Sequence, residues 1–143
     1  DFCANLALDP APEGEALLRR IRDVNPDRGA RALATLALGE RILGRFGVYS
    51  EHPIPKERRE AAVREARAWL SEVVRRYAGA AKVYGAFPVE ERARRRLSAL
   101  RNVLNLEVGK VAPPIEGEDL DGVRFRLADY RGTVVMLDFW GHW

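Results

Sequence analysis

The side chains best suited to chemistry lie near the end of the sequence, where one carboxylate interrupts an apolar run. Residues 133–137 read Thr-Val-Val-Met-Leu, and Asp138, Phe139 and Trp140 follow. Such a run of β-forming residues predicts a strand over 133–139 that is buried on both faces of a sheet. A charged carboxylate is costly to bury there, so we expect the pKa of Asp138 to be raised. If the strand instead lies at an edge, Asp138 simply faces solvent.

The four residues that directly follow this strand form a candidate active-site loop. Trp140 and Trp143 bracket Gly141 and His142. Tryptophans in such a position are typical core and rim aromatics, and Gly141 allows the backbone to turn. His142 is either an ordinary exposed histidine or a source of positive potential that favours a neighbouring thiolate.

The remaining candidate ligands and nucleophiles are isolated from one another. Cys3 is the single cysteine, which excludes a disulfide within this chain, and its position near the N-terminus indicates a lone thiol rather than a nucleophile. His52 lies in a proline-containing loop with no second ligand in view. Two separate histidines do not make a metal site, so we expect no metal and no cofactor.

The segment from Val108 to Trp143 resembles the opening of a redoxin domain of the thioredoxin superfamily, in the branch of TlpA/ResA-like thiol-disulfide oxidoreductases and AhpC/TSA peroxidases. The motifs occur in order: Gly-Lys-Val-Ala-Pro at 109–113, Asp-Gly at 121–122, Leu-Ala-Asp-Tyr-Arg-Gly at 127–132, and Asp-Phe-Trp-Gly-His-Trp at 138–143. The resemblance implies that Asp138 relays protons to and from the inner thiol. It also implies that Trp143 directly precedes the nucleophilic cysteine, where it would shield the sulfur from water.

The segment departs from the redoxin pattern in one decisive respect, because the cysteines that carry the chemistry are absent. We expect a chain that is a fragment at both ends, since it lacks an initiator Met and stops where the nucleophile should follow. One hypothesis is a selenocysteine at the next position, whose codon doubles as a stop. As it stands, the chain should be inactive.

The resemblance implies that the intact protein exchanges thiols and disulfides. Its partners would be a disulfide-bearing protein or a peroxide as substrate, together with a thiol reductant. A peroxiredoxin-type peroxidase is an alternative, although the loop that ends in Trp143 favours a Cys-x-x-Cys exchange site. The family also favours the bacterial cell envelope or periplasm as the compartment.

The rest of the chain is predicted to be helical, which gives an α+β fold class overall. Apolar residues at helical spacing indicate helices over about 13–24, 27–45, 56–78 and 88–105, arranged as a bundle or as TPR-like helical hairpins. Two β-runs, 115–120 and 123–127, flank Asp121-Gly122 and predict a β-hairpin. We therefore expect an α-helical domain at 1–107, followed at 108–143 by the β-hairpin and central strand of an incomplete thioredoxin fold.

Composition narrows the classes of function. The net charge is +3, with 47% hydrophobic residues, and no apolar run reaches the length of a membrane span. Arg92, Arg94, Arg95 and Arg96 follow Glu90 and Glu91, so helical ion pairing explains them better than nucleic-acid binding. A rival hypothesis is that the helices form a protein interaction module whose apolar groove is bordered by Trp69, Tyr77, Tyr84 and Phe87.

Overall fold

The protein is described by a computed structural model that covers residues 2–9, 11–46, 50, 52–104 and 109–141. Most of the described chain is helical, and two small antiparallel sheets complete the fold. The helices are α1 (Phe2–Leu8), α2 (Pro12–Val24), α3 (Arg28–Gly44), α4 (Arg59–Arg76) and α5 (Val89–Val103). A short 3-10 helix, η1 (Lys56–Arg58), leads into α4.

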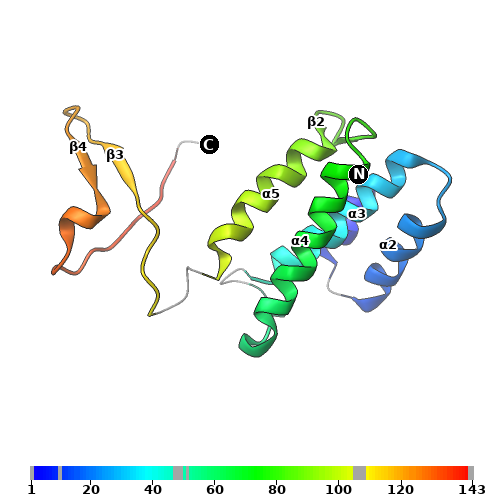
Figure 1. The fold of residues 1–143 in the computed structure, drawn as a ribbon, viewed down its shortest axis with the longest axis horizontal. Helices are drawn as coiled ribbons and strands as arrows, with labels where there is room; N and C mark the ends of the chain where they lie inside the picture. The colour runs from blue at the N-terminus through cyan, green and yellow to red at the C-terminus, as the bar shows by residue number, and fades with distance from the viewer. Residues whose placement is uncertain (1, 10, 47–49, 51, 105–108, 142–143) are drawn as a thin grey trace.

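Helix α3 is the central element of the helical part (Figure 1), and it contacts α1, α2, α4 and α5. Its sequence explains this position, because small and aliphatic residues surround much of its circumference. On one side Ala32 and Leu36 join the core shared with α4 and α5. On the other side Ala34, Ala37 and Leu38 join a second core shared with α1 and α2.

Four of the helices agree with the sequence prediction to within a few residues, but α1 was not predicted. No helix was predicted before residue 13, and prolines, which interrupt helices, occupy positions 10 and 12. Instead, residues 2–8 form a helix that packs on α3, and the break comes only after Leu8. Proline disfavours a helical backbone in the residue before it and disrupts the helical turn in which it lies. A helix that ends before these positions is therefore unaffected.

The expected loop between α4 and α5 contains a minimal hairpin. Strand β1 (Lys82–Val83) pairs antiparallel with β2 (Phe87–Pro88), with Val83 opposite Phe87. Two consecutive turn residues, Tyr84 (φ 49°) and Gly85 (φ 70°), have left-handed backbone conformations. Pro88 therefore belongs to β2, and the helix begins one residue later at Val89.

The predicted C-terminal hairpin is confirmed. Strand β3 (Glu116–Glu118) pairs with β4 (Arg124–Arg126), and Gly117 faces Phe125 across the ladder. Asp119 organises the turn, because its Oδ1 accepts hydrogen bonds from the backbone N–H of Asp121 (3.0 Å) and of Val123 (2.8 Å). Gly122 has a φ of 78°, which favours glycine at this position.

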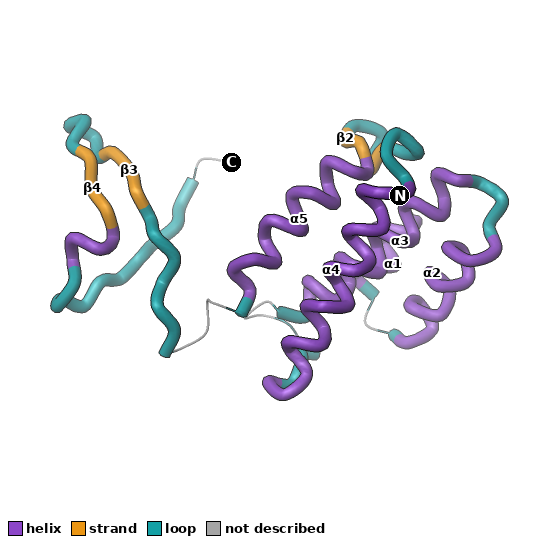
Figure 2. Tube along the Cα trace, in the orientation of Figure 1, coloured by secondary structure: helices purple, strands orange, loops and turns teal. Residues whose placement is uncertain are grey.

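The predicted buried strand at 133–139 is wrong for this structure. Residues 134–141 have no assigned strand partner within the described chain, and Figure 2 draws them as an unpaired segment beyond η2 (Leu127–Tyr130). Val134 and Met136 are 102% and 92% exposed, respectively. A strand is buried only where neighbouring strands and helices cover it, and residues 133–139 are all exposed.

The two parts of the fold lie apart in Figures 1 and 2, with β3 and β4 at one end and the five helices at the other. The mixture of helices and antiparallel strands is consistent with an α+β class. The predicted boundary between residues 107 and 108 falls outside the described residues, so the division into two domains stays a prediction. None of the described helices combines the length and hydropathy of a bilayer span.

Candidate functional site

Asp138 lies in the exposed segment that follows η2. Its side chain is exposed to solvent, so the burial expected from the sequence is not present. Its neighbours Phe139 and Trp140 are 81% and 85% exposed, respectively. The proton-relay role of Asp138 therefore stays a prediction, because no described group lies against its carboxylate.

The other predicted loop residues fall partly outside the description. Gly141 is exposed and has no regular secondary structure, whereas His142 and Trp143 lie beyond the described residues. Trp140 and Gly141 therefore lie on the same exposed segment as Asp138.

The turn before this segment is well defined. The Arg126 backbone N–H donates to Asp129 Oδ2 at 3.0 Å, and the Thr133 hydroxyl donates to the Tyr130 carbonyl at 2.7 Å. Gly132 completes the turn with a φ of 90°. The Leu-Ala-Asp-Tyr-Arg-Gly motif thus forms a short helical step that sets the direction of residues 134–141.

Cys3 is unsuited to nucleophilic chemistry. Its side chain is 7% exposed and packs with Leu18, Ala34 and Leu38. Burial raises the pKa of the Cys3 thiol above its ordinary value, because the thiolate would lose its hydration. The reactive form is therefore scarce at neutral pH, which agrees with the interpretation of Cys3 as a lone structural thiol.

The described residues contain no cluster of three or more side chains that could hold a metal ion. His52 is exposed, and its carbonyl accepts a hydrogen bond from Arg45 Nε at 3.0 Å.

Two of the four aromatic residues predicted to border one groove, Trp69 and Tyr84, line a common cavity, whereas Tyr77 does not. Tyr77 is only 8% exposed and belongs to the main core. The guanidinium groups of Arg19 and Arg22 lie over the Trp69 ring, with their Cζ atoms 5.3 Å and 4.7 Å from the ring centroid. Tyr84 and Phe87 lie near Arg92 and Arg95 of α5.

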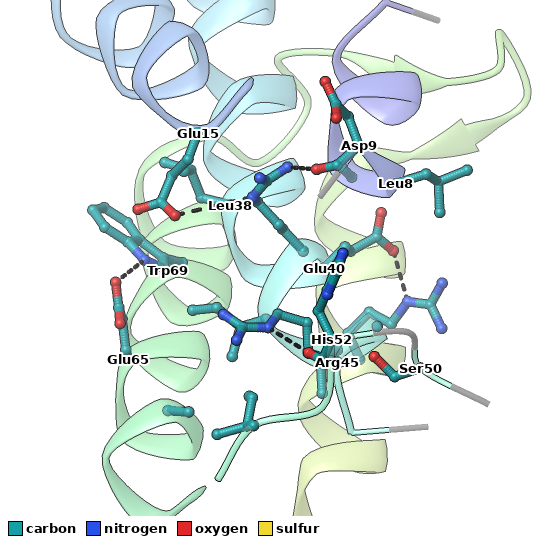
Figure 3. Close-up of a pocket in the computed structure, with 18 of the residues that line it drawn as sticks. Leu8, Asp9, Glu15, Leu38, Glu40, Arg45, Ser50, His52, Glu65 and Trp69 are labelled. Atoms are coloured by element: carbon teal, nitrogen blue, oxygen red, sulfur yellow. Dashed lines mark hydrogen bonds and ion pairs between the residues drawn. The ribbon is translucent and has the colours of Figure 1, made fainter. Parts of the chain in front are cut away.

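A cavity that the sequence analysis missed surrounds the C-terminal half of α3 (Figure 3). Its volume is about 1160 Å³, and its lining residues come from all five helices and from the loop before α4. The lining is mixed, with arginines, carboxylates and apolar groups. No contiguous motif could reveal it, because each helix contributes only one face. The feature of the sequence that could have indicated this cavity is the pair of small residues Ala61 and Ala62 on the otherwise charged surface of α4.

Comparison with known proteins gives matches to one kind of enzyme. Thiol-disulfide oxidoreductase ResA of Geobacillus thermodenitrificans is 53% identical over 36 residues, which are 25% of this chain and 21% of that protein. ResA of Bacillus thuringiensis subsp. konkukian is 45% identical over 38 residues, which are 27% and 22% of the two chains, respectively. About a quarter of this chain is similar to thiol-disulfide oxidoreductases.

These matches support a thioredoxin-like redoxin relationship at the family level for that part of the chain. The matched part spans about a fifth of the length of the curated relatives. No protein-family model matches the chain, and no solved structure matches it.

Proposed function

We propose that the complete protein is a thiol-disulfide oxidoreductase whose redoxin part begins near residue 108. The observation that carries the proposal is the similarity to ResA proteins. The match covers 36 residues, and the segment with the redoxin-like motifs, residues 108–143, has the same length. The substrate class would be a disulfide-bearing protein, with a thiol compound as the ultimate reductant. The bacterial cell envelope is the compartment that this family favours.

The proposed site places a cysteine or a selenocysteine directly after Trp143 and a resolving cysteine three residues beyond it. The thiolate or selenolate of the first residue attacks one sulfur of the substrate disulfide and forms a mixed disulfide or selenenylsulfide, while the other substrate sulfur leaves as a thiolate that takes up a proton. The resolving thiolate then attacks the mixed bond and releases the second substrate thiol. The substrate gains two electrons and two protons, and the enzyme is left oxidised.

Asp138 would serve this cycle by accepting the proton of the resolving thiol and returning it when the enzyme is reduced again. This role requires the carboxyl group to be covered by the remainder of the domain, because burial raises the pKa of a carboxyl group toward neutrality. In chain 1–143 the side chain is exposed, and the nucleophile is absent. We therefore expect no disulfide reductase activity from this chain alone.

The experiment that tests the proposed site is to determine the codons that follow Trp143 in the genome. The proposal predicts a cysteine codon or UGA, then two further codons and a cysteine codon in the same frame. A different stop codon, or downstream codons that encode no such pair, would contradict it.

A further inference from the structure

Three helices present one face each to a common groove, which forms one side of the cavity in Figure 3. Helices α2 and α4 both pack on α3, which forms the floor between them. The residues that line the groove recur at helical spacing: Pro12, Glu15 and Arg19 of α2, Leu38, Arg41, Ile42 and Arg45 of α3, and Arg58, Ala61, Ala62, Glu65 and Trp69 of η1 and α4.

One end of this groove is closed by side chains that bridge α2 and α4. Arg19 pairs with Glu65 at 3.1 Å, and Arg22 pairs with Glu72 at 3.3 Å. Trp69 lies beneath both arginines and donates a hydrogen bond to Glu65 at 3.3 Å. Because these charged side chains already pair with one another, they are not available to bind a charged ligand.

The other end of the groove carries unpaired positive charge. Arg45 and Arg58 are exposed, and neither forms an ion pair with a carboxylate in the described ranges. Arg45 uses only Nε, which donates to the His52 carbonyl, so its two terminal nitrogens remain available. By contrast, Arg92 and Arg96, which line the opposite side of α3, are both held by Glu40.

Ala61 and Ala62 of α4 and Ile42 of α3 add apolar groups to the lining of the same cavity. The short side chains of the two alanines leave room that a Leu or Lys at the same positions would fill. The groove thus combines apolar groups with two exposed guanidinium groups that form no ion pair within the described residues. Such a lining suits a ligand that carries an apolar side chain next to a carboxylate.

We propose that this groove binds an acidic segment of another polypeptide, with its carboxylates on Arg45 and Arg58 and an apolar side chain against Ala61, Ala62 and Ile42. A polypeptide fits the lining better than a nucleic acid, because a polypeptide can place an aliphatic side chain against Ala61, Ala62 and Ile42 next to carboxylates for the two arginines, whereas a sugar-phosphate backbone cannot. This surface is separate from the proposed redox segment and would hold a partner or substrate protein.

The test uses the whole chain 1–143 and a fluorescein-labelled peptide of sequence Leu-Glu-Val-Glu-Leu-Glu-Glu, with its Gln counterpart as the uncharged probe. Fluorescence anisotropy should show saturable binding of the acidic peptide and at least about 10-fold weaker binding of the Gln peptide. The double variant Arg45→Gln/Arg58→Gln should weaken binding of the acidic peptide by a similar factor. Ala62→Trp, which fills the apolar part of the lining, should also weaken it while the circular dichroism spectrum stays unchanged.

A matched control removes the same charge from the other side of α4. Arg67 and Arg75 are exposed and line no part of this groove, so Arg67→Gln/Arg75→Gln should leave the affinity within about 2-fold of the unchanged chain. Equal losses in the two double variants would overturn the proposal in favour of a diffuse charge effect. Tighter binding of an oligonucleotide or of anionic phospholipid vesicles than of the peptide would also overturn it, as would the absence of saturable peptide binding.

Discussion

Gly39 of α3 and Leu70 of α4 lie so close together that a Cβ atom built on Gly39 would be 2.8 Å from Leu70 Cγ. Leu70 is fully buried, so it has little room to move away. Gly39 thus permits the close approach of α3 and α4. The α3–α4 contact at the centre of the helical part therefore depends on a missing side chain.

Gly39→Val should destabilise the protein by about 1–3 kcal/mol, because the added methyl groups overpack the core against Leu70. Urea unfolding followed by circular dichroism measures the change. Gly44→Val is the matched control, since nothing lies within 4 Å of a Cβ atom at the last residue of the same helix. Equal effects of the two substitutions would show that backbone propensity, rather than packing against Leu70, determines the result.

Glu40 joins α3 to α5 through two arginines, and its removal should destabilise the protein. Its carboxylate accepts from Arg92 Nε at 2.8 Å and from Arg96 Nε at 2.6 Å, and its side chain is only 9% exposed. Glu40→Gln should lower the free energy of unfolding by about 1–3 kcal/mol, because a charge-assisted cluster loses its shared acceptor. Thermal and urea unfolding provide the measurement.

The control for Glu40 is Glu91, which pairs with Arg95 on the exposed surface of α5. Glu91→Gln should change the free energy of unfolding by no more than about 0.5 kcal/mol, because exposed helical ion pairs contribute little. If Glu40→Gln is as mild as Glu91→Gln, the Glu40 cluster does not hold α5 against α3.

Glu90 should contribute to the loss of protein stability at acidic pH. Its pKa is lowered from the ordinary value of 4.5, first by a hydrogen bond from its own backbone N–H and then by one from the Gly79 N–H at 3.1 Å. A lowered folded pKa means that the stabilisation is present above the unfolded pKa and is lost as the pH falls through the folded value.

Glu90→Gln should therefore reduce the difference in melting temperature between pH 7 and pH 3, with most of its effect at pH 7. Differential scanning calorimetry at the two pH values measures it, and Glu13→Gln, at an exposed position in the first turn of α2, is the control. A loss of stability of the same size at both pH values would show that the carboxylate charge is not responsible.

The sequence predicted elements whose signals are local. The helices that became α2 to α5 carry apolar stripes over many turns, and the β3–β4 hairpin carries its Asp-Gly turn at residues 121 and 122. The short elements were missed because a helix of one or two turns and strands of two residues have too few positions to show a period. The left-handed Tyr84 gave no warning of the β1–β2 turn, since this conformation is uncommon for tyrosine.

The candidate sites were harder to predict because they depend on contacts between distant residues. The motif predicts the position of Asp138 next to the redox site, but its burial requires neighbouring elements that are not packed on it in this structure. Tyr77 is an aromatic residue of the kind that can border a groove, yet its position on the apolar stripe of the helix directs its side chain into the core. The cavity around α3 could not be predicted for the converse reason, since its lining residues belong to separate stretches of sequence and surround one cavity only after the helices pack.

The measurement that tests the central claim most directly is the reduction of insulin disulfides, driven by dithiothreitol, by the complete gene product. We predict turnover by the complete protein, none above the dithiothreitol background by chain 1–143, and a loss on the order of 100-fold when Asp138 is replaced by Asn. Replacing the residue that follows Trp143 with Ser should abolish turnover. A complete product without activity, or with activity that survives this Ser substitution, would contradict the account.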